Sequence, residues 1–312
     1  MNRVVVNRAV ANRAAVRDTC RRASEPAYRA AFFLPRDKRD GVYAVCAFAQ
    51  LIREAIAPSA PGCCAGDNAA GGVADLVRER VQDLYIDRIE LPRDEFQDST
   101  QRVLAAMVDT LATFEIPRWH WDELIDGLVA DAGVRRYATW RSLQRHAART
   151  AGSVAAIVSC VLRVTSSDIG FIIQLGVATR LTNILASMNA DRSHDRVYLP
   201  LEDLSRFRYS ERELMGGVVN DNLRELIRFE VSRARELFRD GSAGLCWLAG
   251  DGSRMAAAAF VSLQTALLDA IERARFDIFH ANLQLPLARQ LRQLPLAWRL
   301  AQRHSDEAMP RL

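Results

Sequence analysis

The sequence predicts an all-α fold. Apolar residues recur at helical spacing in its long segments, and Leu181, Ile184 and Met188 belong to one such stripe. No pair of alternating apolar runs joined by Asn-Gly or Asp-Gly indicates a β-hairpin. Prolines fall between the periodic segments, as expected of helix boundaries. A chain of 312 residues can bury a large core, in one domain or in two.

We expect one helical domain that spans residues 15–302, with a short extension before it and a short tail after it. We expect residues 1–14 to form an N-terminal extension. It carries an arginine every few positions and has no apolar h-region, so it does not read as a secretory signal. Residues 57–72 are rich in small side chains and predict a mobile loop. Residues 303–312 predict a flexible tail.

The composition is typical of a globular protein without a nucleic-acid-binding surface. The formal net charge is only +4, so bulk electrostatics do not indicate nucleic acid as a partner. No run of about eighteen uninterrupted apolar residues indicates an integral membrane segment. The six cysteines show no metal-ligand spacing, and Cys63 and Cys64 are adjacent. A reduced, cytoplasmic protein is expected.

The segment Arg180–Pro200 carries the clearest chemical signal. It predicts a helix on which Asn183, Ser187 and Asp191 follow one another at four-residue steps and so lie on one face. An amide oxygen, a hydroxyl and a carboxylate suit Mg²⁺, which takes a few protein oxygens and leaves room for phosphate and water. An ordinary polar helix face is the alternative interpretation.

Four segments resemble, in the same order, motifs of the squalene/phytoene synthase family. Phe32–Ala57 resembles the Phe-Leu-Pro-Arg entry into the first aspartate-rich helix, and Arg180–Pro200 resembles the second aspartate-rich motif with its Arg-x-Tyr-Leu-Pro exit. Gly127–Ala155 is similar to the Gly…Asp…Arg-Tyr pattern, and Leu267–Phe279 to the terminal Ile-Glu…Tyr-Asp-Val-Phe stretch. The resemblance covers roughly residues 15–295.

This resemblance implies a single-domain, isoprenoid-synthase-type helical bundle around a central cavity. It also implies Mg²⁺ and an allylic prenyl diphosphate as substrate. Where the first motif should read Asp-Asp-x-x-Asp, however, this chain has Arg53 and Glu54 at the start and Ala57 at the end. Arg53 is expected to contact the diphosphate directly, in place of a metal. Drift in a decayed enzyme, or an ion pair with Glu54 or another acid, is the alternative. Ser187 replaces an aspartate, but class I terpene cyclases use a hydroxyl ligand at the similar position.

The resemblance also implies roles for residues outside the aspartate-rich motifs. Arg36, Arg136 and Arg196 match positions that bind diphosphate or order the site in the family, although each can instead be a surface arginine. Tyr198 is expected to hydrogen-bond the diphosphate or close the site. Asp131 matches a family acid, with structural pairing to Arg136 as the alternative.

Three further residues are expected at the cavity. Tyr28 and Tyr43 would line it, where aromatic faces stabilise a carbocation, with core packing as the alternative. His146 stands where the family usually has a tyrosine and is expected to accept a proton, unless it is a core histidine. The predicted site therefore comprises the catalytic residues Arg53, His146 and Tyr198, the substrate-binding residues Tyr28, Arg36, Tyr43, Glu54, Asp131, Arg136, Arg180 and Arg196, and the metal ligands Asn183, Ser187 and Asp191.

The altered first motif favours an active prenyltransferase with an unusual acceptor. Without that motif little would screen a second diphosphate from the first, so a neutral, electron-rich aromatic is the expected acceptor. The precedent is a set of diverged family members that prenylate carbazole-type aromatics in bacterial natural-product pathways. Dimethylallyl diphosphate is the donor expected first, and a homodimer is left open. The alternatives are a head-to-head squalene/phytoene-type synthase and a non-catalytic assembly protein on the same fold.

Overall fold

The predicted all-α fold is confirmed. The computed structural model describes the backbone alone of residues 2–12, 67–71 and 304–306, and both backbone and side chains of residues 13–57, 72–86, 98–166, 168–281, 283 and 285–303. Over these ranges the chain is helical and contains no strand, only an isolated parallel bridge between Arg136 and Val197.

The helices run from α1 to α15 along the chain, with the short turns η1, η2 and η3 among them. The first half of the chain contains α1 (Asn2–Ala23), α2 (Glu25–Ala30), η1 (Ala31–Phe33), α3 (Arg36–Ile56), α4 (Asp67–Tyr85), α5 (Ser99–Thr113), α6 (Trp119–Gly133), α7 (Trp140–Ala147), η2 (Ala148–Gly152) and α8 (Ser153–Leu162). The second half contains α9 (Gly170–Ser193), α10 (Leu201–Arg206), α11 (Glu211–Gly216), α12 (Asp221–Ser242), η3 (Ala243–Trp247), α13 (Ser253–Arg273), α14 (Leu287–Leu291) and α15 (Leu294–Asp306).

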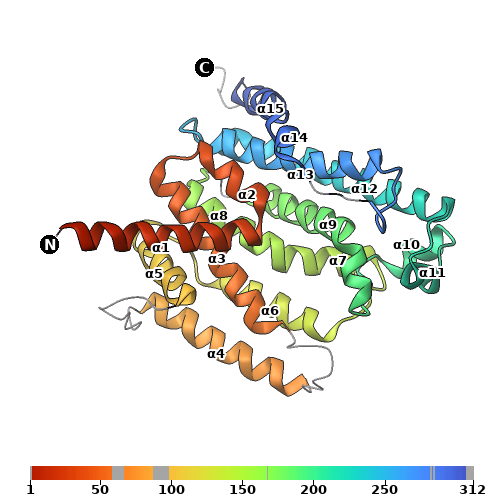
Figure 1. The fold of residues 1–312 in the computed structure, drawn as a ribbon, viewed down its shortest axis with the longest axis horizontal. Helices are drawn as coiled ribbons and strands as arrows, with labels where there is room; N and C mark the ends of the chain where they lie inside the picture. Colours follow the sequence, from red (N-terminus) through yellow and green to blue (C-terminus); the bar gives the residue numbers. More distant parts are fainter. Residues whose placement is uncertain are drawn as a thin grey trace.

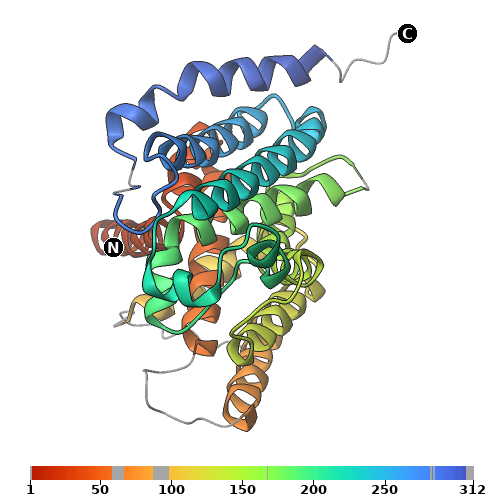
Figure 2. The ribbon, with the colours of Figure 1, turned by 90° about the vertical axis from the view of Figure 1, so that its right-hand side faces the viewer.

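Three helices, α3, α8 and α9, form the middle of the bundle (Figure 1). On one side, α1, α4, α5 and α6 pack against them around a first apolar core that contains Phe48, Met107 and Trp121. On the other side, α12 and α13 pack against α9 around a second core that contains Leu185, Ile227 and Phe238. Helix α15 lies outermost, over α13 (Figure 2). The space between the two cores is where a cavity can form.

A close backbone approach sets the position of α9. A Cβ atom on Gly176 of α9 would lie 2.6 Å from the Cα of Gly152, at the end of η2. That distance is far below any van der Waals contact, so only glycine allows the two backbones to approach this closely. The turn η2 is a π-helix, a local widening that is frequent near functional sites. The motif helix α9 is thereby held against the centre of the bundle.

The predicted domain boundaries change at three points. Residues 2–14 do not form a separate extension, because they share one continuous helix, α1, with residues 15–23. The predicted loop 57–72 is wrong at its end, since α4 begins at Asp67, and residues 58–66 lie outside the described residues. The predicted tail 303–312 is wrong at its start, because α15 continues to Asp306, and residues 307–312 lie outside the described residues.

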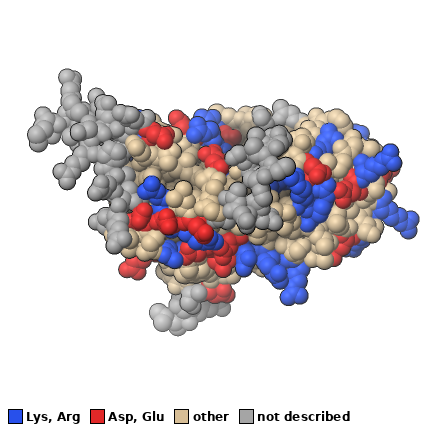
Figure 3. Space-filling view, turned by 90° about the horizontal axis from the view of Figure 1, so that it is seen from below, with Lys and Arg blue, Asp and Glu red and all other residues tan. Residues whose placement is uncertain are grey.

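Two helices are long and apolar enough to cross a membrane when judged by length and composition, α9 and α13. Half of the α9 window and 61% of the α13 window lie buried inside the protein, which is the pattern of core helices. On the face shown in Figure 3, acidic and basic side chains are interspersed, so that face presents both signs of charge.

Candidate active site

Two segments of the predicted site run side by side. The amide of Val197 donates to the carbonyl of Arg135 at 2.9 Å, and the amide of Leu201 donates to the carbonyl of Tyr137 at 2.9 Å. This short parallel pairing stacks the rings of Tyr137 and Tyr198 with their centroids 5.8 Å apart. The exit of α9 is therefore fixed to the segment after α6, although about 60 residues of chain separate them.

Asp131 is the centre of a buried hydrogen-bond network. Its Oδ1 accepts from the Tyr137 hydroxyl at 2.8 Å, and its Oδ2 accepts from the Tyr198 hydroxyl at 2.8 Å. Nη1 of Arg196 donates to Oδ2 at 3.2 Å and to the Tyr198 hydroxyl at 2.9 Å. Burial raises the pKa of Tyr198, so its hydroxyl keeps the proton that it donates. The network holds Arg196 and Tyr198 in fixed positions at one side of the site.

His146 is joined to the same network in its neutral form. Its Nε2 lies 3.6 Å from Oδ1 of Asp131 and 3.4 Å from Nη2 of Arg180. Burial lowers the pKa of His146 to about 4, and the favourable influence of Asp131 does not compensate. We infer that Nε2 carries a lone pair, because it faces a guanidinium donor.

Arg53 and Arg180 are two cationic side chains whose charges influence each other. Burial and the neighbouring Arg180 lower the pKa of Arg53, even though solvent reaches its side chain from the cavity. The guanidinium of Arg180 lies 4.8 Å from the centre of the Tyr198 ring, and its buried Nε has no hydrogen-bond partner. Among the described residues, neither arginine forms an ion pair with a carboxylate. This arrangement suits a bound anion, which would satisfy both cations.

The pairing of Arg53 with Glu54, offered as an alternative, is not formed. Nη1 of Arg53 donates to Oε1 of Gln50 at 3.0 Å, and Nε2 of Gln50 donates to Oε1 of Glu54 at 2.9 Å. Gln50 therefore separates the two charges on the surface of α3. In the described part of the chain, Glu54 accepts a hydrogen bond from Gln50 and contacts no member of the Asp131 network.

The predicted metal ligands lie on one helix, as the spacing indicates. All three are on α9, where the Ser187 hydroxyl donates to Oδ2 of Asp191 at 2.7 Å and Asn183 faces the cavity. Burial raises the pKa of Asp191, while the hydroxyl of Ser187 opposes that rise. No group of three or more His, Cys, Asp or Glu side chains is placed to hold a metal in the described part of the chain. One carboxylate, one hydroxyl and one amide fit a single Mg²⁺ whose remaining ligands are phosphate and water oxygens.

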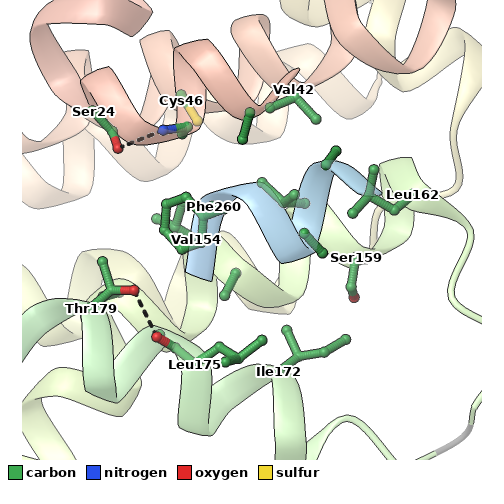
Figure 4. A pocket seen from close by; sticks show the side chains of 18 of the residues that line it. Ser24, Val42, Cys46, Val154, Ser159, Leu162, Ile172, Leu175, Thr179 and Phe260 are labelled. Carbon is green, nitrogen blue, oxygen red and sulfur yellow. Dashed lines mark hydrogen bonds between the residues drawn. The ribbon is translucent and has the colours of Figure 1, made fainter. Parts of the chain in front are cut away.

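An apolar cavity of about 230 Å³ lies next to these residues. Side chains from α3, α8, α9 and α13 line it, among them Val42, Val154, Leu175 and Phe260 (Figure 4). Arg53 on α3 and Asn183 on α9 belong to the same lining. The cavity thus joins an apolar interior to the cationic and amide groups of the site, which suits an amphiphile with an anionic head.

Two predicted arginines lie outside this arrangement. Arg36 is exposed at the start of α3 and lies 3.9 Å from Asp40. Arg136 binds Asp195 and Glu211, each at 2.7 Å, rather than Asp131. Asp195 has a φ of 54°, so Arg136 secures a tight left-handed turn after α9. The pairing of Asp131 with Arg136 offered as an alternative is wrong, and both arginines act on the surface of the fold.

Neither of the two tyrosines expected in the cavity lies there, since Tyr43 is a core residue and the half-buried Tyr28 packs against it. Tyr28 and Tyr43 stack on each other at a centroid distance of 5.3 Å, and neither lines the cavity. The hydroxyl of Tyr43 donates to the carbonyl of Tyr28 at 3.3 Å. Conversely, Tyr137 enters the site without being among the predicted residues, although it directly follows Arg136 in the Arg-Tyr motif. Its adjacency to Arg136 is the only signal for it in the sequence.

The comparisons with known proteins agree on one family. A family model described as squalene/phytoene synthase matches residues 20–289. A 15-cis-phytoene synthase of Synechocystis sp. is 38% identical over 210 residues, which cover 63% of this chain and 62% of that protein, less than two-thirds of its length. A 15-cis-phytoene synthase of Synechococcus elongatus is 28% identical over 309 residues, covering 93% of this chain and 95% of that protein.

Solved structures show the same fold. A dehydrosqualene synthase in complex with ligand superposes with a TM-score of 0.80 at 19% identity, covering 95% of this chain and 99% of that one. Squalene synthase HpnC from Alicyclobacillus acidocaldarius gives a TM-score of 0.71 at 20% identity, covering 85% and 95%. The names of the sequence relatives favour the head-to-head alternative over an aromatic acceptor. The chain belongs to the squalene/phytoene synthase family, whose members transfer prenyl groups.

Proposed function

We propose that this protein binds one allylic prenyl diphosphate, ionises it, and transfers the prenyl group to a neutral aromatic acceptor. The observation that carries the proposal is that Arg53, in the lining of the cavity, and Arg180, over the ring of Tyr198, both lack a carboxylate partner among the described residues. Arg53 stands where the family resemblance leads one to expect a metal-binding aspartate. A diphosphate between the two arginines would remove their mutual repulsion and gain charge-assisted hydrogen bonds.

Ionisation requires stabilisation of the departing diphosphate. Arg53, Arg180 and Arg196 supply positive charge, and the Asp131 network keeps Arg196 and Tyr198 in place without reorganisation. Asn183, Ser187 and Asp191 would hold Mg²⁺, which as a Lewis acid supplies further charge stabilisation when it is bound. The hydroxyl of Ser187 donates to Oδ2 of Asp191, which would leave Oδ1 and the lone pairs of the hydroxyl available to such an ion.

The prenyl chain would occupy the apolar cavity. A volume of about 230 Å³ is below the range of about 300–1,000 Å³ that is usual for ligand sites, so the cavity suits one prenyl chain better than two. The cavity walls carry mostly aliphatic and small side chains, which offer an allylic cation few nucleophilic groups.

His146 would accept the proton that an aromatic acceptor loses after attack. The low pKa of His146, caused by burial, makes it a weak base in the free protein. A diphosphate bound at Arg180 would add negative charge beside the imidazole and raise its proton affinity. The base would therefore become competent only after the substrate binds, which keeps proton transfer coupled to ionisation.

A head-to-head squalene/phytoene-type synthase is the second candidate, and the names of the sequence relatives favour it. That reaction joins two prenyl diphosphates, so two diphosphates must be accommodated. Here the positions of the first motif hold Arg53 and Ala57 in place of metal ligands. The charge of a second diphosphate would then have to be neutralised by arginines alone. This is the physical reason to place the head-to-head synthase second.

The experiment that separates the candidates is diphosphate release from dimethylallyl, geranyl, farnesyl and geranylgeranyl diphosphates, with and without EDTA. Each donor is assayed alone and with a panel of electron-rich aromatic acceptors. Release that rises with an aromatic, together with a prenylated aromatic in the products, supports the first candidate. Release from farnesyl or geranylgeranyl diphosphate alone, with a C30 or C40 hydrocarbon product, establishes the second. No release under any condition in folded protein refutes both.

A further inference from the structure

Two cysteines from different helices lie in contact where α1 packs against α3. Cys20 of α1 is fully buried, whereas Cys46 of α3 is 8% exposed. The two thiols share a hydrogen bond, and both cysteines are free. We call these two residues the cysteine pair. Neither thiol has a part in the ionisation or in the proton transfer proposed for the site.

The contacts one turn earlier independently place the two sulfurs opposite each other. Nη2 of Arg17 on α1 lies 4.0 Å from Oδ1 of Asp40 on α3, and the same guanidinium lies 5.9 Å from the centre of the Tyr43 ring. Cys20 follows Arg17 by three residues. Cys46 likewise follows Tyr43 by three residues. Because residues three apart lie on the same face of a helix, the next contact along both helices joins the cysteine pair.

The cysteine pair lies in the wall of the apolar cavity. Cys46 belongs to the cavity lining, as does Val42 one turn before it on α3 (Figure 4). On the side of α1, Ala23 and Ser24 follow Cys20 by one turn and line the same cavity. A small molecule in the cavity therefore reaches the sulfur of Cys46 first. A shorter distance between the two sulfurs would bring two walls of the cavity together.

We propose that Cys20 and Cys46 form a reversible disulfide when hydrogen peroxide enters the cavity, and that this bond narrows the cavity. A disulfide holds its sulfurs about 2 Å apart, much closer than two thiols in non-covalent contact, so its formation draws α1 towards α3. In a reducing compartment such a bond is transient and regulatory. The disulfide does not depend on the reaction that the protein performs, whereas its effect on a prenyl chain rests on the proposed function.

Cys46 is the thiol that reacts with the peroxide. The hydrogen bond from Cys20 lowers the pKa of Cys46, and the positive charge of Arg53 acts in the same direction, although burial opposes both. The Cys46 sulfur attacks one peroxide oxygen, the O–O bond breaks, and the released hydroxide takes the Cys46 proton and leaves as water. The product is a sulfenic acid on Cys46.

Cys20 then completes the disulfide. Its sulfur attacks the Cys46 sulfur, the S–O bond breaks, and the hydroxyl leaves as a second water with the Cys20 proton. The two thiols together lose two electrons, which reduce one hydrogen peroxide to two waters. A dithiol reductant reverses the process by thiol–disulfide exchange and is itself oxidised to a disulfide.

The test is peptide mapping of the full chain after treatment with hydrogen peroxide and alkylation of the remaining thiols. Trypsin separates the cysteine pair, because Cys20 falls in the peptide 18–21 and Cys46 in the peptide 40–53. We expect a crosslinked species of these two peptides that dithiothreitol removes. The control variant Cys160→Ser with Cys246→Ser, which lacks the other two described cysteines, should form the same species.

The order of the two steps is tested with dimedone, which traps sulfenic acids. Dimedone should label Cys46 in the variant Cys20→Ser at least about tenfold more than it labels Cys20 in the variant Cys46→Ser, because only Cys46 lines the cavity. Preferential labelling of Cys20 would contradict the assignment of Cys46 as the reacting thiol.

Titration calorimetry with geranyl thiolodiphosphate, an analogue that resists ionisation, measures the effect on the cavity. Oxidised wild type should bind the analogue roughly tenfold more weakly than reduced wild type, because the narrowed cavity is overpacked by the chain. Dithiothreitol should restore the affinity. In the variant Cys20→Ser with Cys46→Ser, the same peroxide treatment should leave the affinity unchanged, and circular dichroism confirms that the variants fold.

Two results would overturn the proposal. The first is the absence of the crosslinked peptides at a peroxide concentration that oxidises the half-buried Cys246. The second is a disulfide that leaves the affinity of wild type for the analogue unchanged, because the bond would then not narrow the cavity. A folded, reduced protein that binds no analogue would instead contradict the proposed function, and the peptide map would still decide whether the disulfide forms.

Discussion

The Nε2 atom of His146 lies 3.4 Å from the guanidinium Nη2 of Arg180. A protonated imidazole would repel that guanidinium, and burial already lowers the pKa of His146 to about 4. Burial, assisted by the charge of Arg180, therefore keeps the histidine uncharged at physiological pH. Protonation of His146 is consequently linked to unfolding, because the unfolded chain carries a histidine with an ordinary pKa near 6.5.

Replacement of His146 by phenylalanine should change how stability depends on pH. The folded pKa is depressed, so the stability associated with the neutral ring is complete above about pH 6.5 and is lost as pH falls towards 4. We expect wild type to lose on the order of 3 kcal/mol of unfolding free energy through this group, and His146→Phe to lack that part of the slope. Urea unfolding at a series of pH values measures it. Parallel pH profiles for the two proteins would contradict the assignment.

Arg53 should bind diphosphate directly. Removal of a charge-assisted hydrogen bond costs about 1.5–3 kcal/mol, so Arg53→Ala should weaken the binding of inorganic diphosphate roughly tenfold to a hundredfold. Titration calorimetry measures this without turnover. Arg36→Ala is the matched control, since Arg36 lies on the same helix but is exposed and pairs with Asp40. Equal losses in the two variants, or no loss in Arg53→Ala, would remove Arg53 from the site.

Asp191 should contribute most of the Mg²⁺ affinity on α9. It is the only carboxylate of the predicted triad, so we expect Asp191→Asn to weaken Mg²⁺ binding by more than tenfold, and Ser187→Ala by less. Calorimetric titration of Mg²⁺ in the presence of inorganic diphosphate gives both affinities. Asn189→Ala serves as control, because Asn189 is on the same helix and bonds Arg192. Unaltered Mg²⁺ binding in Asp191→Asn would show that the ion binds elsewhere.

The bond between Tyr198 and Asp131 should be measurable as a coupling energy. Tyr198→Phe removes the donor of the 2.8 Å hydrogen bond, and Asp131→Asn removes the charge that accepts it. A double-mutant cycle on the unfolding free energy is expected to give about 1–2 kcal/mol. Tyr209→Phe is a suitable reference, because its hydroxyl bonds only the backbone carbonyl of Val218. Additive effects of the two changes would mean that the contact does not stabilise the fold.

Gly176 should not tolerate a side chain. The Cβ of Gly176→Ala would lie 2.6 Å from the Cα of Gly152, so α9 must move away from η2, at a cost of about 1–3 kcal/mol or more. Gly72→Ala is the control, because nothing lies within 4 Å of its Cβ in α4. There the substitution should stabilise by roughly 0.5–1 kcal/mol. Thermal unfolding measures both. Similar melting temperatures for the two variants would show that the contact with Gly152 is relaxed at no cost.

The local features of the site were readable from the sequence. Helical periodicity and the absence of hairpin signals predict the all-α fold, and steps of four residues place Asn183, Ser187 and Asp191 on one helix face. These features depend on neighbours within one or two turns, so spacing alone determines them. The family motifs also identify Asp131, Arg196 and Tyr198, which the structure joins in one network.

Only the tertiary structure decided which of the motif residues meet. Arg36 and Arg136 match motif positions as well as Arg196 does, yet one is exposed and the other secures a surface turn. Tyr28 and Tyr43 pack on each other, while Tyr137 enters the site. The sequence by itself thus determined the helices and the donor set on α9. The approach of Arg53 to Arg180, and of His146 to Asp131, arises from the packing of separate helices, a long-range property that no local spacing encodes.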